Sequence, residues 1–380
     1  TNSDTSTITG IISDGASSAI LTKAGSGTLT LSANNTYTGQ TNINFGIISI
    51  THNNALGSTN GATIVADGAS VSISNDITSA ENITINGTGI SSNGAIRNTA
   101  DDNTLTGLIT LAANSEIQID SGSSLTLNPT SGSAITGTYN LTIESVGTST
   151  ISDPIAISTG NITKTGAGTL TLSGTNSYTG DTTISNGTIK LTGAVNAATD
   201  LIIASGATLD LQSTQTFATL DLDGTISNST GSSELTISGT SDLGGSITTS
   251  GTQDYEGAIT LTGNTTLVSG DQITFDTTVN SETDETNNLT VTATELQVDG
   301  IIGGSRTLGA ISITGILDLN AAITNATSLS VSTTSNLGAN VTTSSTQTYS
   351  GAVTLSGADR TLTGSIINFV STLAGGTNGL

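Results

Sequence analysis

The sequence has no cysteine, methionine or tryptophan, only two prolines, and six lysine and arginine residues among 380. Without cysteine there is no disulfide framework, no thiolate nucleophile and no cysteine-based zinc site. No run of about 18 apolar residues is present, so no membrane-spanning helix is predicted. The lack of methionine, and of signal-peptide features in the first twenty residues, indicates a mature product or a segment of a longer chain.

Positive charge is scarce, and the formal net charge is −23 at pH 7. A nucleic-acid groove needs clustered lysine and arginine to neutralise phosphates, and attraction to anionic lipid needs them as well. We therefore expect no nucleic-acid partner and no membrane insertion of this segment. The basic residues are too widely separated for either role: Lys23, Arg97, Lys164, Lys190, Arg306 and Arg360.

The residues that are abundant form strands. Hydrophobic residues make up 33% of the chain, charged residues 9% and aromatic residues 2%, with 46 glycines, and serine and threonine supply about a third. Disordered chains usually have few β-branched residues and much proline, lysine and glutamate. This chain is instead rich in threonine, isoleucine and valine, which favour β-structure. The composition therefore predicts an all-β protein.

Two different internal repeats organise the chain. KAGSGTLTLSANNTYTGQTNINFGIISI at 23–50 and KTGAGTLTLSGTNSYTGDTTISNGTIKL at 164–191 are identical at 16 of 28 positions without a gap. A second repeat occupies 241–286 and 335–380, beginning SDLGGSITTSGTQDYEG and SNLGANVTTSSTQTYSG. Self-similarity of this kind indicates a repeat architecture. We expect one continuous segment over 1–380, with the first repeat in 1–215 and the second in 216–380.

Inside the repeats, apolar residues alternate with polar ones, which buries one face of a strand. The strands end at Gly or Asn-Gly, which turn the chain tightly. Strands of three to five residues form a stable sheet only when successive coils stack in parallel, about 4.8 Å apart. The pattern predicts an elongated right-handed parallel β-helix (β-solenoid). Six leucines are expected inside it: Leu29, Leu31, Leu170, Leu172, Leu209 and Leu211.

A coil of about 20–25 residues would give about 15–19 coils over about 70–90 Å, and about four coils in the 94-residue spacing of the second repeat. Asparagines at the turns are expected to form hydrogen-bonded ladders between coils. The competing architectures are a β-sandwich array and a β-propeller. A sandwich array predicts domain-sized repeats separated by linkers, and a propeller predicts repeats of about 40–50 residues with aromatic signatures. The sequence shows neither.

The pattern GxGTLTLSGxNxYTGxTTIxxGTIxL at 164–191 resembles the passenger-associated transport repeat, also called the autotransporter-associated β-strand repeat. The copy at 23–50 departs from it at Ala33, Phe45 and Ile47. The TQTYSGAVTL units are similar to repeats of filamentous-haemagglutinin-like exoproteins. These resemblances imply a β-helical passenger of a bacterial type V autotransporter or of a very large adhesin-like surface protein, exported through an outer-membrane pore.

No residue is predicted to be catalytic, to bind a cofactor or to ligate a structural metal. Catalysis by a Ser-His-Asp triad would need the single histidine, His52, and no GxSxG elbow is present. We interpret His52 as a loop residue. The GxG pairs at 25–27 and 166–168 precede TLT, so they are interpreted as turn glycines and not as part of a nucleotide-binding fingerprint.

Some β-helices are polysaccharide-acting enzymes, in which paired carboxylates perform the hydrolysis. Glycoside hydrolysis needs two carboxyls about 5–9.5 Å apart, and Asp221 and Asp223 point outward from one strand; Asp210 and Asp318 occupy similar settings. With few aromatic or basic residues to hold a sugar, these are expected to be solvated surface groups. At most, weak surface Ca²⁺ binding is expected at the remaining acidic clusters: Asp101, Asp102, Glu282, Asp284 and Glu285.

Several repeated residues are expected to be structural. Tyrosine recurs at fixed repeat positions, where we expect it to stack over a turn and cover the edge of a coil: Tyr37, Tyr178, Tyr255 and Tyr349. Because the two copies of the first motif align without a gap, we expect both to occupy the same position in the coil. Gly39 and Gly180 are then expected at one shared corner, with φ > 0.

We expect a non-enzymatic, secreted or surface-exposed adhesin-like structural stalk of the autotransporter type, associated with the outer membrane of a Gram-negative cell. Its partners would be a host or neighbouring-cell surface, or other copies of itself. The alternative is a self-associating extracellular filament, sheath or surface-layer polymer, and a minor alternative is a polysaccharide-acting β-helix enzyme. An adhesin should display loops of uneven length on one face, and a polymer should have uncapped ends and self-complementary sides.

Overall fold

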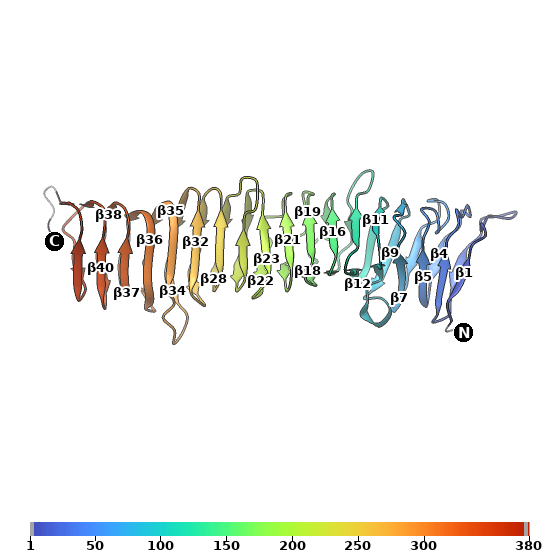
Figure 1. The fold of residues 1–380 in the computed structure, drawn as a ribbon, viewed down its shortest axis with the longest axis horizontal. Helices are drawn as coiled ribbons and strands as arrows, with labels where there is room; N and C mark the ends of the chain where they lie inside the picture. The colour runs from blue at the N-terminus through green and yellow to red at the C-terminus, as the bar shows by residue number, and fades with distance from the viewer. Residues whose placement is uncertain (1–3, 376–378, 380) are drawn as a thin grey trace. The chain divides into compact units, whose positions relative to one another are not determined.

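A computed structural model describes residues 4–375 and Gly379. The chain divides into two compact units, Thr1–Thr199 and Asp200–Leu380. Each unit consists of short β-strands that pair in parallel (Figure 1). The described residues contain one 3₁₀ turn, η1 (Ile90–Ser92), and no helix that is long and apolar enough to cross a membrane. The predicted parallel β-helix is confirmed, with about 18 turns.

Within residues 4–199, the first unit contains 21 strands, most of them two to five residues long. Their bounds are β1 (Ser6–Ile8), β2 (Leu21–Lys23), β3 (Thr28–Leu31), β4 (Thr41–Ile43), β5 (Gly46–Ile50), β6 (Thr63–Val65), β7 (Ala69–Ile73), β8 (Thr78–Ser79), β9 (Ile83–Gly87), β10 (Ile96–Asn98), β11 (Asp102–Leu105), β12 (Ile109–Ile119), β13 (Ser124–Leu127), β14 (Ile135–Thr136), β15 (Leu141–Ser145), β16 (Thr148–Ile151), β17 (Ile155–Ala156), β18 (Ile162–Thr165), β19 (Thr169–Leu172), β20 (Thr182–Ile184) and β21 (Thr188–Leu191).

Strands of the first unit stack into three faces that the chain visits in order. Face 1 contains β2, β4, β6, β9, the start of β12, β14 and β17. Face 2 contains β1, β3, β5, β7, β10, the end of β12, β15, β18 and β20. Face 3 contains β8, β11, β13, β16, β19 and β21. One turn takes about 19–26 residues, as the pairs Thr28–Ile47 and Ser115–Leu141 show.

The described part of the second unit contains 23 strands. Their bounds are β22 (Leu201–Ile203), β23 (Thr208–Leu211), β24 (Gln215–Phe217), β25 (Leu220–Leu222), β26 (Thr225–Ser227), β27 (Leu235–Ile237), β28 (Ser241–Leu243), β29 (Ser246–Thr249), β30 (Gln253–Tyr255), β31 (Ile259–Leu261), β32 (Thr265–Ser269), β33 (Gln272–Phe275), β34 (Val279–Ser281), β35 (Leu289–Val298), β36 (Leu308–Leu319), β37 (Ile323–Val331), β38 (Ser335–Leu337), β39 (Val341–Thr343), β40 (Thr346–Tyr349), β41 (Val353–Leu355), β42 (Leu362–Thr363), β43 (Ile366–Phe369) and β44 (Leu373–Ala374).

The repeats do not span a whole number of turns. The first motif copy begins on face 1, with β2, and the second begins six turns and one face later, with β18 on face 2. In the second unit, β28 and β38 begin the two copies of the second repeat and lie four turns and two faces apart. The expectations of a shared place in the coil and of four coils per 94 residues are therefore wrong. The local sequence fixes a turn and its two strands, but not the face on which they lie.

Inward side chains fill the core, largely as predicted. Leu31, Leu170, Leu172, Leu209 and Leu211 are buried. The expectation for Leu29 is wrong, because this side chain is only half-buried. It pairs with Ser6 of β1 and lines a pocket beside that first strand, so little of the chain covers it.

Asparagine ladders join the turns, as expected. The backbone amides of Asn140, Asn161 and Asp181 each donate to the side-chain oxygen of the residue one turn earlier, at 3.0, 2.9 and 3.0 Å. The first acceptor in this ladder is Asn114. Each amide keeps a partner at a corner where strand pairing has stopped, as buried or half-buried backbone groups require.

Candidate functional site

The lysine of the first motif is the feature that the sequence reading missed. Lys164 is an inward-facing residue of β18, and its side chain is fully buried. Its Nζ donates to the carbonyls of Ser145 (3.3 Å), Thr165 (2.6 Å), Gly166 (2.7 Å) and Asn186 (3.3 Å). These acceptors belong to three successive turns. The ammonium therefore ties three turns together at one corner.

Burial lowers the pKa of Lys164 to about 8, while the negative charge of Glu144 acts in the opposite direction. A buried ammonium is costly unless it is hydrogen-bonded. Here three N–H donors are shared among four carbonyl oxygens. The signal in the sequence was the position of the lysine, two residues after the inward-facing Ile162.

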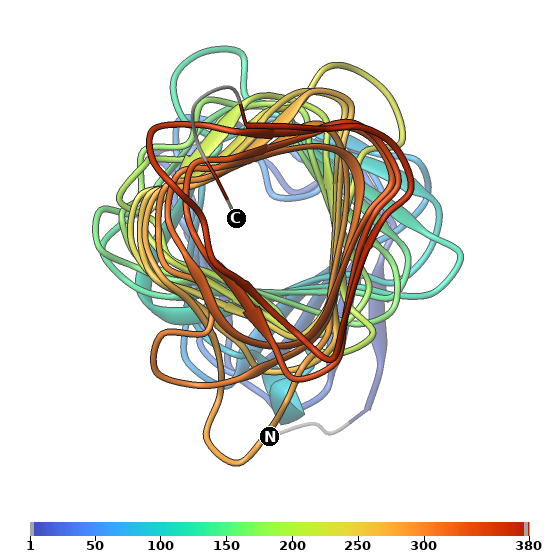
Figure 2. The ribbon, with the colours of Figure 1, turned by 90° about the vertical axis from the view of Figure 1, so that its left-hand side faces the viewer.

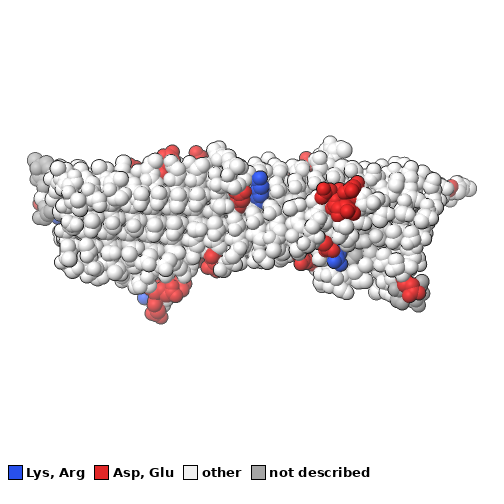
Figure 3. Space-filling model, in the orientation of Figure 1, with Lys and Arg blue, Asp and Glu red and all other residues white. Residues whose placement is uncertain are grey.

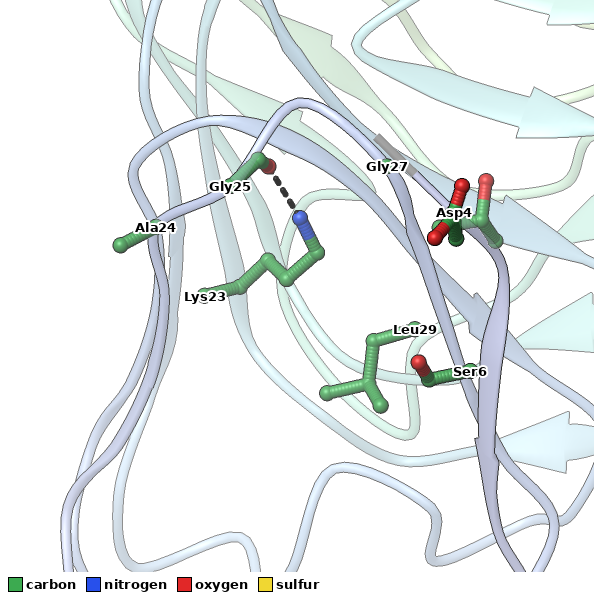
Figure 4. A pocket seen from close by; sticks show the side chains of 8 residues that line it. Asp4, Ser6, Lys23, Ala24, Gly25, Gly27 and Leu29 are labelled. Atoms are coloured by element: carbon green, nitrogen blue, oxygen red, sulfur yellow. Dashed lines mark hydrogen bonds between the residues drawn. The ribbon is translucent and has the colours of Figure 1, made fainter. Parts of the chain in front are cut away.

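Lys23 repeats this arrangement in the first copy. Its Nζ donates to Gly25 of its own turn and, at 3.0 Å, to the carbonyl of Phe45 in the next turn. Figure 4 shows the side chain reaching toward Gly25, with Leu29 and Ser6 along the same pocket. The pocket has a volume of about 370 Å³. Burial lowers the pKa of Lys23 as well.

A glycine of the next turn makes room for each lysine. Gly46 has φ 73° and Gly187 has φ 71°, a region that glycine enters without strain. A Cβ on Gly46 would lie 2.6 Å from Nζ of Lys23, and one on Gly187 would lie 2.5 Å from the carbonyl oxygen of Gly166. These glycines are therefore required by both backbone conformation and space.

Gly39 and Gly180 do not have the positive φ that we expected. They lie at different corners, and the neighbouring turn crowds each of them. A Cβ on Gly39 would lie 2.7 Å from the carbonyl carbon of Ala19, and one on Gly180 would lie 2.7 Å from that of Gly160. Close approach of backbones, and not backbone strain, explains the glycine.

The motif tyrosines lie inside the core, so the expectation that they cover an edge is wrong. Tyr37 and Tyr178 are fully buried. The hydroxyl of Tyr37 lies 2.6 Å from Oγ1 of Thr41, and that of Tyr178 lies 2.8 Å from Oγ1 of Thr182. Burial raises the pKa of both phenols to about 12. Each ring fills the core while its hydroxyl keeps a partner.

The motif asparagine links the turns on either side of it. Oδ1 of Asn35 accepts from the amide of Ile12 at 2.8 Å, and its Nδ2 donates to the carbonyl of Ala55 at 2.6 Å. The equivalent bonds of Asn176 are 2.9 and 3.0 Å long. Both asparagines are buried. The lysine and the asparagine of the motif thus bond between turns, its glycines lie where adjacent turns approach closely, and its tyrosine fills the core.

The second repeat buries a different polar pair. The hydroxyls of Tyr255 and Tyr349 donate to Oε1 of Gln253 and Gln347 at 3.0 and 3.1 Å. Nε2 of each glutamine donates to a carbonyl of the next turn at 2.8 Å. Each tyrosine ring meets a phenylalanine of the next turn, at centroid distances of 5.7 and 5.4 Å. These tyrosines are also core residues.

A polar cluster lies on the outer side of face 2. Arg97 pairs with Asp120 at 2.8 Å, and the loop before β10 covers Glu116 and Gln118. Burial, together with repulsion and hydrogen bonding from the neighbouring Glu144, raises the pKa of Glu116 to about 7. Beside this cluster is a groove of about 120 Å³, lined mainly by hydroxyl groups: Thr28, Ile47, Ser49, Ser70, Ser72, Ile90, Asn93, Arg97 and Thr99.

The predicted carboxylates are not drawn into one site. Asp221 and Asp223 are exposed on and after β25, as expected, and Asp221 lies in register with Asp242. Partial burial and repulsion from the other two raise the pKa of Asp221. Asp210 and Asp318 lie on other strands, β23 and β36. On the face shown in Figure 3, acidic side chains form small groups separated by uncharged surface.

The remaining candidates are turn residues. His52 lies in a turn, where its Nδ1 accepts from the amide of Asn54 at 3.1 Å. The glycine pairs at 25–27 and 166–168 form the corners around the two lysines. Asp101 and Asp102 accept hydrogen bonds from the adjacent turns. Within residues 4–375 and 379, no three histidine, cysteine or acidic residues are grouped to hold a metal ion.

Residues 21–50 and 162–199 match the family model of the passenger-associated-transport-repeat. No curated protein and no solved structure matches the chain. The two matched segments contain both copies of the lysine–asparagine–tyrosine motif, so the resemblance stated for them is confirmed. This repeat on a β-solenoid fits a structural domain of the autotransporter passenger type.

Proposed function

We propose that this chain is the structural stalk of a secreted or surface-exposed, adhesin-like bacterial protein. The observation that carries the proposal is where the motif residues lie. Lys164 and Asn176 are buried and bond between turns, and Tyr178 is buried with its hydroxyl on Thr182, leaving mainly threonine and serine outside. A motif used in this way serves the cohesion of the coil and not the binding of a ligand. The family match supports a location at the cell surface or outside the cell.

Loops supply the surfaces through which such a stalk would contact a host or neighbouring cell. In the first unit, the loops at 88–94 and 128–134 leave on opposite sides of the stack, and in the second unit those at 228–234 and 282–288 do so (Figures 1 and 2). The expectation that an adhesin displays its loops on one face is therefore not met. The proposed stalk carries loops on several sides.

Small-angle scattering and a binding assay test the proposal with the full chain. A stalk of about 18 stacked turns should give a maximum dimension of about 70–90 Å at about 4.8 Å per turn. Beads coated with the chain should adhere to cells, and a variant with serine at each charged or apolar position of the four loops should adhere less. A compact particle, or adhesion that is unchanged by the loop variant, would contradict the proposal.

The same preparations address the alternatives. Light scattering over a range of concentrations detects the self-association expected of a filament or surface-layer polymer. Assays on pectin, glycan and protein substrates test the expectation that the chain is not an enzyme, with Asp221→Asn/Asp223→Asn as the matched variant. Concentration-dependent assembly without cell adhesion would favour the polymer, and turnover that the variant abolishes would favour the enzyme.

A further inference from the structure

Asn186 and Gly187 form the corner that faces Lys164. Asn186 is exposed to solvent. The amide nitrogen of Gly187 donates to Oδ1 of Asn186 at 2.7 Å, so the side-chain carboxamide lies directly against the nitrogen of the following residue. Gly187 has no side chain to hinder closer approach, and its φ is 71°. The amide is therefore placed as an internal nucleophile toward Cγ of Asn186.

Lys164 acts on the same peptide group. Its Nζ donates to the backbone carbonyl oxygen of Asn186 at 3.3 Å. That oxygen belongs to the peptide whose nitrogen is Gly187 N. When this nitrogen loses its proton, the negative charge spreads onto the oxygen, and an ammonium hydrogen-bonded there stabilises it. Lys164 is thus positioned to make the amide of Gly187 more acidic and more reactive.

We propose that Asn186 is a site of spontaneous modification, converted to aspartate or isoaspartate through a succinimide whose formation Lys164 promotes. The amide of Gly187 gives its proton to solvent, and its nitrogen bonds to Cγ of Asn186. The carboxamide nitrogen takes up a proton and leaves as ammonia. Water then adds to either carbonyl of the ring and breaks one C–N bond. The net change is one water consumed and one ammonia released, with no oxidant or reductant.

The chain provides internal comparisons. Asn60–Gly61, Asn86–Gly87 and Asn93–Gly94 have the same two residues, but no lysine bonds to their peptide oxygens among the described contacts. Nδ2 of Asn86 is also held by the carbonyl of Val65 at 3.0 Å. In the first motif copy, Lys23 bonds to the carbonyl of Phe45, before Gly46, so the lysine is present without the asparagine.

Peptide mass spectrometry of the full chain, incubated at 37 °C and neutral pH, measures the rates. We expect Asn186 to be modified about tenfold faster than Asn60, Asn86 and Asn93. A tenfold difference in rate corresponds to about 1.4 kcal/mol in the barrier. Lys164→Met should remove this advantage, and Lys164→Arg should retain most of it. A rate at Asn186 no faster than at Asn60 or Asn93 would overturn the proposal.

A gain-of-function variant covers the case in which Lys164→Met fails to fold. Phe45 is 59% exposed, so Phe45→Asn should leave the fold intact and place an Asn-Gly pair beside Lys23. We expect the introduced asparagine to be modified at a rate close to that of Asn186, and Lys23→Met added to it to slow the reaction. Circular dichroism confirms folding. If the introduced asparagine stays intact, or if Lys23→Met leaves its rate unchanged, the role of the lysine is refuted.

Discussion

The two copies of the first motif lie on different faces of the coil and yet make the same bonds. Lys23 and Lys164 both reach carbonyls of their own turn and the next, and Tyr37 and Tyr178 both meet a threonine four residues later. The first copy begins on face 1 and the second on face 2. The motif therefore specifies the hydrogen bonds between one turn and its neighbours, whichever face of the coil the motif occupies.

The copies differ in what surrounds them. Lys164 has four acceptors, and the hydroxyl of Tyr178 pairs with that of Thr182. Lys23 has two acceptors at the start of the stack, and a nearby carboxyl, that of Glu81, raises the pKa of Tyr37. The two copies should thus lose similar stability when the tyrosine ring is removed and different stability when the lysine charge is removed.

Removal of a tyrosine ring should have the largest effect, and a similar one in both copies. Tyr37→Ala and Tyr178→Ala each delete a fully buried ring, which should cost about 3–5 kcal/mol of local stability. Hydrogen exchange followed by mass spectrometry should show faster exchange only in the adjoining turns, because each turn contacts its neighbours alone. Unchanged protection, or collapse of the whole chain, would contradict this.

Removal of the ammonium should separate the copies. Lys164→Met leaves carbonyls of three turns without their shared donor, and we expect a loss of about 2–4 kcal/mol, against about 1–2 kcal/mol for Lys23→Met. Urea denaturation of the two variants measures the difference. Arginine at the same positions provides the charge-retaining control, and equal losses for both methionine variants would show that the number of acceptors is unimportant.

Glycine substitutions distinguish crowding from backbone strain. Gly180→Ala places a Cβ 2.7 Å from the backbone of Gly160, and should cost about 1–3 kcal/mol through overpacking. Gly122 has φ 77° and nothing within 4 Å of its Cβ position, so Gly122→Ala introduces backbone strain alone. We expect the smaller loss at Gly122, about 1 kcal/mol. Thermal unfolding of the two variants provides the measurement, and the reverse order would refute the crowding argument.

Acidification from pH 8 to pH 5 should stabilise the turns around the first copy and not those around the second, where burial lowers the pKa of Lys164 to about 8. The hydroxyl of Thr63, in the core near Tyr37, donates to the carboxylate of Glu81 at 2.9 Å. Burial raises the pKa of Glu81 from 4.5 to about 7. The folded state then holds a proton that the unfolded state lacks, so this stabilisation is complete below about pH 4.5 and is lost as the pH rises through about 7. Between pH 5 and 8 this corresponds to a loss on the order of 2–3 kcal/mol.

Hydrogen exchange around Tyr37 and Tyr178, measured at both pH values and corrected for the intrinsic rate, tests this difference. Glu81→Gln removes the titrating group and should abolish the response around Tyr37. The turns around Tyr178 provide the comparison, because the lowered pKa of Lys164 should give a small loss of stability there on acidification. Equal pH dependence in both regions, or a response that survives in Glu81→Gln, would show that Glu81 is not its source.

Much of the fold follows from the sequence because it depends on local patterns. Alternation in segments such as TLTL fixed which side faces inward, and Asn-Gly and Gly fixed the turns, so a parallel β-helix was predictable. The face occupied by each strand was not, because it depends on the summed length of all preceding turns. Leu29 shows the same limit, since its exposure depends on how much chain covers it and not on its own pattern.

The motif residues were harder to place than the strands. Lysine is seldom fully buried, so its recurrence alone did not indicate a core position. The decisive clue was its inward phase in LTK and ITK, which the alternation already contained. Tyr178 was expected to cover the edge of a coil because tyrosine recurs at fixed repeat positions. Inside the core, the hydroxyl of Thr182 is the partner of the Tyr178 hydroxyl. The sequence does not show that side chains four residues apart meet at this bend.

The spacing of six turns and one face has a consequence for inheritance. A duplicated gene segment that encodes one motif can be inserted so that the new copy begins on any of the three faces. Each face presents the same kind of parallel strand edge to the next strand. Insertion or deletion of a single strand with its corner rotates everything downstream by one face and keeps every inward residue inward. Chains of this kind can therefore gain or lose length in steps of one third of a turn. A protein whose repeats had to match whole turns would tolerate far fewer such events.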